Sequence, residues 1–381
     1  MRFANRISRL AVSPIREILH VIDQPGMISF AGGLPSADSF PEISVAALDH
    51  QQLQYGASEG DANLRRFIAS DLAERGLQVT AEQVLVLSGS QQGIDLVAKL
   101  LIDCGSRVAL ESPTYLAALQ VFSLFGADYL PFTPQTISTL EDQHDVSVTY
   151  VVPTFQNPTG HCYSAEQRNS LAAACDANQS VLFEDDPYRD LSYDDCERRP
   201  VCSFVKNASW VYQSSFSKTL APGLRLGYLV CSSDLFERLC WLKQASDLHS
   251  NRLSQHLVLS QLTNPHAPTR LLNVVADYRA RRDFFAQELD KHFGGLASWQ
   301  VPAGGLFFWL KIHSDQPFDT VSLLKEALAH KVAFMPGEPF FPVLAENPGF
   351  IRLNFSHASA AQVVSGIETL ATLIASRLAS R

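Results

Sequence analysis

Residues 148–160 read VTYVVPTFQNPTG, a short apolar run that ends in a polar loop with two prolines and a glycine. Val148–Val152 is rich in β-branched and aromatic residues and is bounded by turn residues, which predicts a buried strand. Similar runs recur between residues 45 and 265, with apolar helical stretches between most of them. The other predicted strands are Val84–Leu87, Arg107–Leu110, Ser180–Glu184, Trp210–Gln213 and Leu226–Cys231. This alternation predicts an α/β fold with a mostly parallel sheet between helices.

The breaker cluster at 264–268, NPHAP, marks a predicted domain boundary. A long helix is expected at about 269–292, then short strands around 306–312 and 350–355, and a last helix after Ser359. We therefore expect two domains. An N-terminal arm with part of the small domain spans 1–44, a large ligand-binding domain spans 45–265, and a small α+β domain spans 266–381.

Local signals predict where several helices begin. S/T-x-x-Q capping boxes at Thr80–Gln83, Ser164–Gln167 and Ser359–Gln362 each predict a helix start. Residues 7–22 are expected to form a short amphipathic helix interrupted by Ser13-Pro14. Residues 24–41, rich in glycine and proline, are expected to be extended.

The composition excludes several classes of protein. The chain has 381 residues, 46% of them hydrophobic and 18% charged, and a net charge of −9, as is typical of a globular protein that does not bind nucleic acid. No apolar run approaches 18 residues and no signal peptide is evident, so we expect a cytoplasmic protein without a membrane anchor. Seven cysteines without a C-x-x-C pair predict neither disulfides nor a metal site. Most are expected to be buried.

Polar residues follow the predicted strands at the edge where ligands bind in open α/β sheets. These segments are Ser88–Gly93, Glu111–Tyr115, Pro153–Gly160, Asp185–Tyr188 and Ser214–Thr219. Each has an ordinary structural interpretation by itself. Ser88–Gly93 could be a helix cap, Asp185–Tyr188 a solvated turn, and Lys218 a surface side chain. Several such segments on one edge instead indicate a ligand.

The ligand that suits this set has four features. It carries an anion for a helix N-terminus, a flat ring for Tyr115, a basic ring nitrogen for a carboxylate, and a carbonyl that condenses with a lysine amine. Pyridoxal 5′-phosphate (PLP) has all four, and it is bound in proteins through a lysine Schiff base with an acidic partner for the ring nitrogen. The residues therefore favour PLP as the cofactor.

The chain resembles the fold-type I PLP-dependent aminotransferases of class I/II. The resemblance covers essentially the whole chain, in the family order. It rests on Ser90–Gly93, Asn157–Gly160, Asp185 with Tyr188, Ser215–Gly227 and Ile351–Ser356. Leu53–Gly56 and Ser29–Pro35 are similar to the 2-aminoadipate/kynurenine/aromatic aminotransferase branch. This family has a large domain with a mostly parallel seven-stranded sheet between helices, and a smaller α+β domain.

The resemblance implies a role for each matching residue. Lys218 would form the Schiff base, Asp185 would pair with the ring nitrogen, and Asn157 and Tyr188 would bind the ring hydroxyl oxygen. Tyr115 would stack on the ring. The residues implied around the phosphate are Ser90, Gln91, Ser215, Ser217 and Arg225, with Tyr55 reaching across from the neighbouring subunit of a homodimer. Arg352 would bind the substrate α-carboxylate, helped by Asn157 and the Gly33 backbone.

The implied activity is transfer of the amino group of an L-amino acid, such as 2-aminoadipate, glutamate or an aromatic amino acid, to a 2-oxo acid such as 2-oxoglutarate. Ser13–Leu19 is similar to the N-terminal helix of the 2-aminoadipate branch, where Arg16 would approach the far carboxylate of an acidic substrate. A solvated Arg16 is an equal alternative.

Two alternative functions stay open. A PLP enzyme of the same fold could be a β-lyase, a decarboxylase or an amino-acid oxidase, because these chemistries share the cofactor residues. The same domain also occurs in GntR-type regulators, which would make this chain a silent amino-acid sensor. The chain is acidic and begins close to the aminotransferase arm, so we expect an enzyme.

Overall fold

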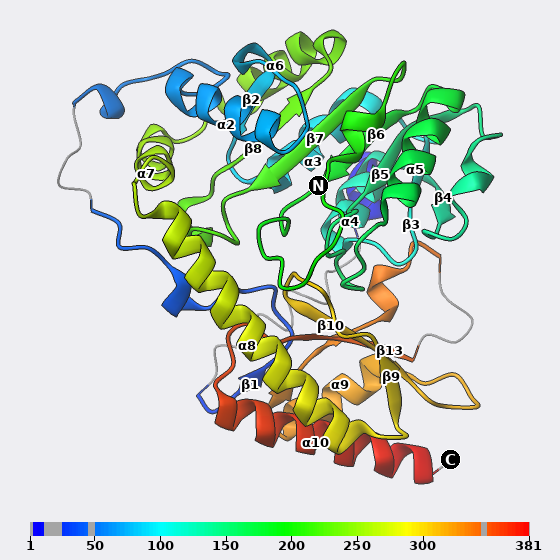
Figure 1. The fold of residues 1–381 in the computed structure, drawn as a ribbon. Coiled ribbons are helices and arrows are strands. Elements are labelled where there is room, and N and C mark those ends of the chain that lie inside the picture. Colours follow the sequence, from blue (N-terminus) through cyan, green and yellow to red (C-terminus); the bar gives the residue numbers. More distant parts are fainter. Residues whose placement is uncertain (1–2, 11–24, 45–49, 344–348, 381) are drawn as a thin grey trace.

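The computed structural model describes residues 3–10, 25–44, 50–343 and 349–380. Two β-sheets lie at opposite ends of one long helix, α8 (Ala267–Phe293), which runs from the upper to the lower part of the view in Figure 1. This helix was predicted at 269–292. Its first turn carries Pro268, which is tolerated there because the first amides of a helix have no intrahelical acceptor.

The larger sheet has seven strands in the order β2-β8-β7-β6-β5-β3-β4. Their bounds are β2 (Val84–Leu87), β3 (Arg107–Glu111), β4 (Asp128–Phe132), β5 (Val146–Val151), β6 (Val181–Asp185), β7 (Trp210–Ser215) and β8 (Gly227–Cys231). Only β8 is antiparallel to its neighbours, β2 and β7. The six predicted strands and the mostly parallel sheet are thus confirmed. Strand β4 was missed because it is a partly exposed edge strand that contains Pro131.

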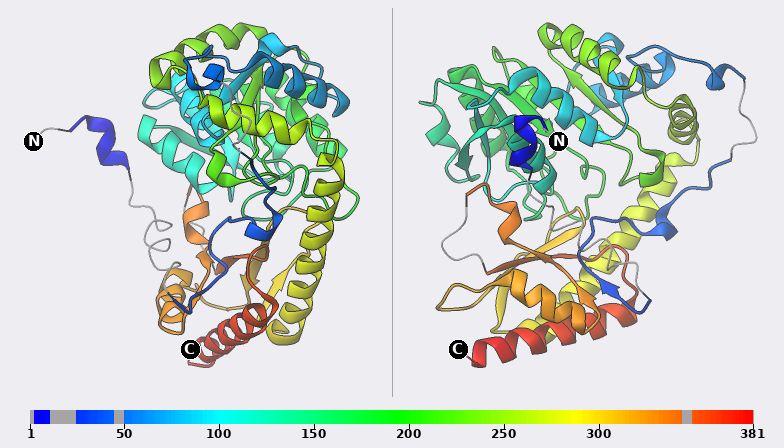
Figure 2. Two further views of the ribbon diagram at one scale, coloured as in Figure 1. Left: turned by 90° about the vertical axis from the view of Figure 1, so that its left-hand side faces the viewer. Right: turned by 180° about the vertical axis from the view of Figure 1, so that it is seen from behind.

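Helices cover both faces of this sheet (Figure 2). One face packs against α3 (Ser90–Leu101), α4 (Leu116–Phe125) and α6 (Ser233–Asp247), and the other against α2 (Ala62–Glu74), α5 (Ala165–Asn178) and α7 (Arg252–Leu262). Strand residues alternate between the two layers. Leu85 and Leu87 join the first core, whereas Val84 and Val86 join the second. Every residue of β2 is therefore buried, which explains its unbroken apolar sequence.

The second sheet has the order β12-β13-β10-β9 and is antiparallel. It consists of β9 (Ala297–Trp299), β10 (Phe307–Ile312), β12 (Met335–Pro336) and β13 (Phe350–Asn354), with α9 (Thr320–Ala329) and α10 (Ala360–Ala379) nearby. The strands predicted at 306–312 and 350–355 are β10 and β13. The N-terminal segment joins this part through β1 (Ile28–Ser29), which pairs in parallel with β11 (Val332–Ala333).

The capping boxes give a mixed result. Ser164 and Ser359 open α5 and α10 as predicted. Thr80 also opens a helix, but this is a single 3₁₀ turn, Ala81–Gln83, which leads directly into β2. Of the amphipathic helix expected at 7–22, the described part is a 3₁₀ turn, Asn5–Arg9, and residues 11–24 lie outside the description. No helix among the described residues is long and apolar enough to cross a membrane. Three of the seven cysteines are buried, so the expectation that most are buried was wrong.

The remaining short 3₁₀ turns connect these elements. They are Ala37–Ser39, His50–Leu53, Ile137–Leu140, Val201–Phe204, Pro222–Leu224 and Glu338–Phe340. The turn at 222–224 ends at Arg225, whose φ of 47° is left-handed. That conformation turns the chain from the end of the Lys218 loop into β8.

Candidate active site

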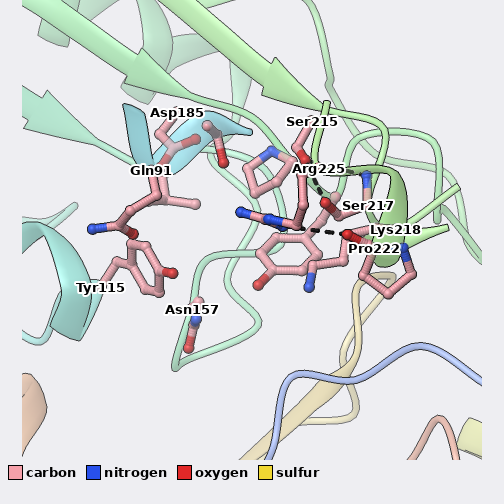
Figure 3. A pocket seen from close by; sticks show the side chains of 13 residues that line it. Gln91, Tyr115, Asn157, Asp185, Ser215, Ser217, Lys218, Pro222 and Arg225 are labelled. Carbon is pink, nitrogen blue, oxygen red and sulfur yellow. Dashed lines mark hydrogen bonds between the residues drawn. The ribbon is translucent and has the colours of Figure 1, made fainter. Parts of the chain in front are cut away.

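A cavity of about 270 Å³ lies at the carboxyl ends of the parallel strands (Figure 3). Ten of the predicted cofactor residues line it. These are Ser90, Gln91, Tyr115, Asn157, Asp185, Tyr188, Ser215, Ser217, Lys218 and Arg225. The prediction did not include Val152, Pro187 and Pro222, which also line the cavity and supply apolar surface. Sequence segments as distant as 90 and 225 therefore meet at one rim.

One end of the cavity suits an anion. Helix α3 begins there after Gly89, which makes no side-chain cap, so amides of its first turn remain available for a ligand. Glycine is favoured at position 89 by its φ of 85°, and a Cβ there would lie 2.6 Å from the Arg225 guanidinium, which would have to move. The hydroxyls of Ser215 and Ser217 are 2.9 Å apart beside this guanidinium in the cavity wall. Amides, hydroxyls and one fixed cation thus converge as they do at phosphate sites.

Asp185, the last residue of β6, carries a buried carboxylate that is only half satisfied. Its Oδ2 accepts a hydrogen bond of 2.8 Å from the Tyr150 hydroxyl, whereas Oδ1 has no hydrogen-bond partner. Burial raises the pKa of Asp185 to about 7. A buried oxygen without a partner is costly unless a ligand completes it. A protonated ring nitrogen would do so.

Lys218 lies in the loop after β7, and its buried amine donates a 2.8 Å hydrogen bond to the carbonyl oxygen of Gly33. Burial, together with the positive charges of Arg352 and Arg225, lowers the pKa of Lys218 to about 8. A considerable fraction of neutral amine is therefore present near neutral pH, which is what a nucleophile and proton carrier needs.

Arg352, on β13, connects the second sheet to the cavity. Its Nη1 donates to Asn157 Oδ1 at 2.7 Å and its Nη2 to the Ala31 carbonyl at 2.6 Å, while Nε has no partner. The guanidinium lies over the Phe307 ring, 4.1 Å from its centre. Burial lowers the pKa of Arg352 to about 10. A buried, incompletely paired guanidinium is suited to bind a carboxylate.

One predicted cofactor residue, Tyr55, does not line the cavity of this chain. Tyr55 is 76% exposed, and its ring packs edge-on against His249 with 5.8 Å between ring centres. Arg16 lies in 11–24, outside the described residues. Within one chain the structure therefore brings together the other ten predicted cofactor residues but not Tyr55.

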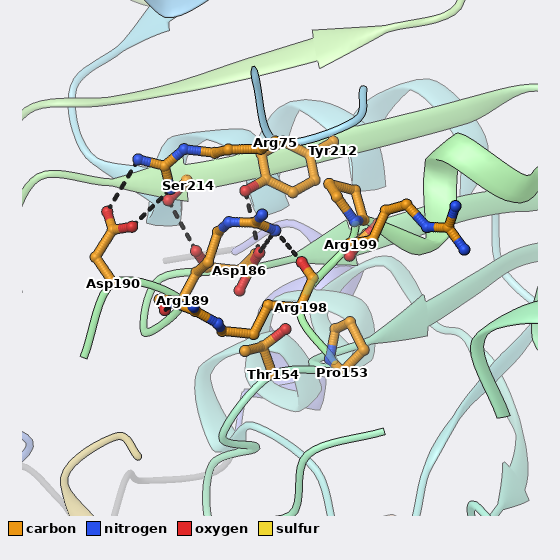
Figure 4. A network of polar contacts seen from close by, with 12 residues as sticks. Arg75, Pro153, Thr154, Asp186, Arg189, Asp190, Arg198, Arg199, Tyr212 and Ser214 are labelled. Atoms are coloured by element: carbon orange, nitrogen blue, oxygen red, sulfur yellow. Dashed lines mark hydrogen bonds and ion pairs between the residues drawn. The ribbon is translucent and has the colours of Figure 1, made fainter. Parts of the chain in front are cut away.

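The next residue, Asp186, belongs to a separate polar network (Figure 4). Asp186 points to the other face of the sheet, where its Oδ2 accepts a 3.1 Å hydrogen bond from the Tyr212 hydroxyl and lies 3.8 Å from Arg189. The Ser214 hydroxyl donates to the Asp186 carbonyl at 2.8 Å. The two neighbouring carboxylates thus face different surroundings, and Asp186 does not line the cavity.

Sequence reasoning missed Gln213, the neighbour of Asp185 on β7. Its side chain is fully buried and neither amide atom has a full hydrogen bond, although its proximity lowers the pKa of Asp185. Space for it exists because residue 93 is glycine: a Cβ there would lie 2.1 Å from Gln213 Oε1. A single polar residue in an apolar strand was the only available signal.

The residues present fit PLP. Asp185 Oδ1 lacks a partner where the ring nitrogen would be held, and α3 and Arg225 provide the anion site. No group of three metal-binding side chains occurs in the part of the chain that the structure describes. A mostly parallel seven-stranded sheet with this site defines the fold-type I PLP-dependent enzymes.

A family model places the chain within this class. "Aminotransferase class I and II" matches residues 25–370, so the protein belongs to that family. It is 32% identical to a 2-aminoadipate transaminase of Thermus thermophilus, over 99% of this chain and 97% of the relative. It is 30% identical to aromatic-amino-acid aminotransferase 1 of Thermococcus litoralis, over 98% and 94%.

The fold agrees with a solved structure, the α-aminoadipate aminotransferase of Thermus thermophilus in complex with N-(5′-phosphopyridoxyl)-L-leucine. The TM-score is 0.89 at 31% identity, covering 100% of this chain and 98% of that one. The predicted family, fold type and cofactor are confirmed. The protein is a PLP-dependent aminotransferase that acts on amino acids and 2-oxo acids.

Proposed function

We propose that this aminotransferase takes 2-aminoadipate, glutamate or an aromatic amino acid as donor and 2-oxoglutarate as acceptor. The names of the two relatives described above support these donors. The observation that carries the proposal is Arg352, a buried guanidinium with an unpartnered Nε beside the Asn157 loop and the Lys218 amine. The positive charge of Arg352 would bind the α-carboxylate of the substrate. This favours a reaction in which the carboxylate is retained, so it favours transamination over decarboxylation.

The bound cofactor supplies an aldehyde that condenses with amines and a ring that accepts the electron pair released at the substrate Cα. Asp185 would hold the proton at the ring nitrogen, and Asn157 and Tyr188 would bind the ring hydroxyl oxygen. Tyr115 would orient the ring by stacking on it. Ser90, Gln91, Ser215, Ser217 and Arg225 would hold the phosphate.

Lys218 would move the proton between the substrate Cα and the cofactor carbon that carries the amino group. Its depressed pKa suits this exchange, because the amine must accept and release a proton near neutral pH. Arg352 would bind the α-carboxylate through two parallel hydrogen bonds, with help from Asn157 and the Gly33 backbone. This contact would fix which face of Cα meets Lys218.

The same proposal includes a homodimer and a two-domain chain. The exposed Tyr55 would reach the phosphate of the neighbouring subunit. Residues 1–44 would form an N-terminal arm and part of the small domain, 45–265 the large domain, and 266–381 the rest of the small domain. The pairing of β1 with β11 supports the assignment of part of the N-terminal segment to the small domain. We propose a cytoplasmic location.

A donor screen tests the proposed substrates. The protein is mixed with PLP, one amino acid at a time and 2-oxoglutarate, and glutamate is measured (for glutamate as donor, the aspartate or alanine formed from another 2-oxo acid). We expect turnover with 2-aminoadipate, glutamate and aromatic donors, and none with Lys218→Ala. Release of CO₂, ammonia or peroxide without amino transfer would instead support a decarboxylase, a β-lyase or an oxidase.

A further inference from the structure

Two buried polar side chains outside the cavity connect two chain segments that line it. Glu111 is the last residue of β3, and Gln156 directly precedes Asn157 in the loop after β5. Each of the two is only 2% exposed, and neither lines the cavity. Burying a polar side chain is costly unless hydrogen bonds replace those made with water, so the partners of these two residues show what they hold in place.

Glu111 holds the beginning and the end of the loop 153–163, which carries Asn157. Its Oε2 accepts a 2.8 Å hydrogen bond from the amide of Val152, directly after β5, and its Oε1 accepts one of 3.0 Å from the Tyr163 hydroxyl. Tyr163 is fully buried, and its amide donates to the Pro153 carbonyl at 2.8 Å. One carboxyl group therefore fixes both stems of the loop to the end of β3.

Gln156 holds the tip of the same loop. Its Nε2 donates a 2.7 Å hydrogen bond to the carbonyl oxygen of Pro113, two residues before Tyr115. Its Oε1 accepts hydrogen bonds from the amide and the hydroxyl of Thr159, at 2.9 and 2.7 Å. The residue next to Asn157 is thus tied both to its own loop and to the segment that carries Tyr115.

We propose that Glu111 and Gln156 are positioning residues, which set the place of Asn157 relative to Tyr115 at the cofactor ring. The inference rests on the proposed contacts of Tyr115 and Asn157 with that ring. Tyr115 follows Glu111 by four residues, and Asn157 follows Gln156 directly, so both links lie close to the side chains that they would position. Fully satisfied hydrogen bonds between buried groups make such a link rigid.

A third residue holds the base of the loop independently of Glu111. Arg168, in the first turns of α5, is fully buried. Its Nη2 donates to the Pro153 carbonyl and the Thr154 hydroxyl at 3.0 Å each, and its Nε donates to the Tyr163 carbonyl at 3.1 Å. Pro153 and Thr154 are labelled in Figure 4. Because Arg168 keeps the base in place, loss of the Glu111 hydrogen bonds should shift the loop without unfolding it.

The hydrogen bonds of Glu111, rather than its charge, should provide this positioning. Burial raises the pKa of Glu111 to about 8, against the opposing hydrogen bonds from Val152, Tyr163 and Gln156. The carboxyl is therefore mostly protonated at neutral pH, and it can donate to the Tyr163 oxygen. Glutamine has the same shape and can make the same two contacts, so Glu111→Gln is the conservative replacement. Glu111→Leu removes both hydrogen bonds at a similar volume.

The test compares the holoenzymes of Glu111→Gln, Glu111→Leu and Asn157→Ala with the starting protein. The absorbance of the bound cofactor is titrated against pH, and KM and kcat are measured with a donor found in the screen above. Glu111→Leu should shift the midpoint of the absorbance titration in the same direction as Asn157→Ala, because both disturb the contact with the ring hydroxyl oxygen. It should raise KM roughly tenfold, with a smaller change in kcat, because Asn157 also accepts the hydrogen bond from Arg352. Glu111→Gln should match the starting protein in both measurements.

Two further variants extend the test. Gln156→Met removes the donor to Pro113 and should act like Glu111→Leu; an unchanged midpoint would overturn the role of Gln156. Tyr163→Phe removes one hydroxyl and should give a smaller shift in the same direction. It replaces Glu111→Leu in the comparison if that variant does not fold.

The double variant of Glu111→Leu and Asn157→Ala decides whether Glu111 acts through Asn157. Its midpoint and KM should be close to those of Asn157→Ala alone, since two changes along one connection are not additive. Additive changes would overturn the proposal, and so would a Glu111→Leu protein that differs only in its unfolding temperature. Glu111→Gln that is as impaired as Glu111→Leu would also overturn it. An unchanged spectrum in Asn157→Ala would overturn the proposed role of Asn157 and this inference with it, whereas a shift in Asn157→Ala without one in Glu111→Leu would overturn this inference alone.

Discussion

Replacing Asp185 by Asn should make the cofactor-free protein more stable while nearly abolishing its activity. Burial raises the pKa of this carboxyl from its ordinary 3.8 to about 7. The folded state therefore holds the proton to a higher pH than the unfolded chain, and the free energy of unfolding falls as the pH rises between these two values. About three pKa units at 1.36 kcal/mol each give an upper value of roughly 4 kcal/mol above pH 7.

The same substitution should reduce the rate about a thousandfold. A carboxylate about 4 Å from a protonated ring nitrogen contributes roughly 4 kcal/mol at an effective dielectric constant near 20. That is about three orders of magnitude in rate if the contribution is lost in the transition state. Asn is nearly isosteric and can still accept the hydrogen bond from Tyr150, so the packing around residue 185 should persist.

The assay is thermal and urea unfolding of cofactor-free protein at pH 5 and pH 8, together with turnover of the holoenzyme. The stability gain should be about two to three times larger at pH 8 than at pH 5. Asp186→Asn is the matched control. It is equally buried, and burial raises its pKa as well although Arg189 lies opposite, so Asp186→Asn should likewise stabilise the cofactor-free protein at pH 8 but keep most of the activity. The reasoning would be refuted if Asp185→Asn destabilised the protein equally at both pH values. It would also be refuted if the two variants lost activity equally.

Four further predictions concern single residues. Lys218→Ala should lose the borohydride-trapped cofactor peptide and nearly all turnover; a trapped peptide that maps to Lys243 or Lys206 would contradict the assignment. Tyr55→Phe should weaken PLP retention in a protein that light scattering reports as a dimer, and an active monomer would refute the shared site. Arg16→Ala should raise KM about ten- to hundredfold for acidic substrates only, since a hydrogen-bonded charge contributes roughly 1.5–3 kcal/mol; an equal loss on an apolar donor would indicate damage to the fold. Gln213→Leu should stabilise the cofactor-free protein by about 1–3 kcal/mol, because it removes two unpartnered buried polar atoms, and should raise the dissociation constant of PLP a few-fold; unchanged stability by urea unfolding would contradict this role.

The parts of the fold that could be predicted are those with a strong local pattern. The central strands are short, apolar and followed by polar loops, and six of seven were found within about two residues. Strand β4 could not be found, because an exposed edge strand does not need an apolar sequence. The Thr80 capping box shows a related limit, since a cap indicates where a turn begins but not how long the helix continues.

The site could be predicted from the sequence only in part. Residues at strand ends could be grouped because parallel strands bring their carboxyl ends to one edge. The fit of Gln213 against Gly93 depends on packing between distant segments, which no local pattern encodes. Tyr55 belongs to neither group, since its proposed partner lies on another subunit.

Three ionisable groups at the site share one property that explains why it should bind its cofactor tightly. Burial raises the pKa of Asp185 and lowers those of Lys218 and Arg352, so in each case the charged form is disfavoured. The apolar cores on both faces of the sheet stabilise the fold enough to hold these groups out of water. A ligand that places a cationic ring nitrogen at Asp185 and a substrate carboxylate at Arg352 restores the missing partners, and its binding is then added to the free energy of unfolding. The buried charges that weaken the empty fold are thus the ones that the cofactor and a substrate carboxylate would pair with.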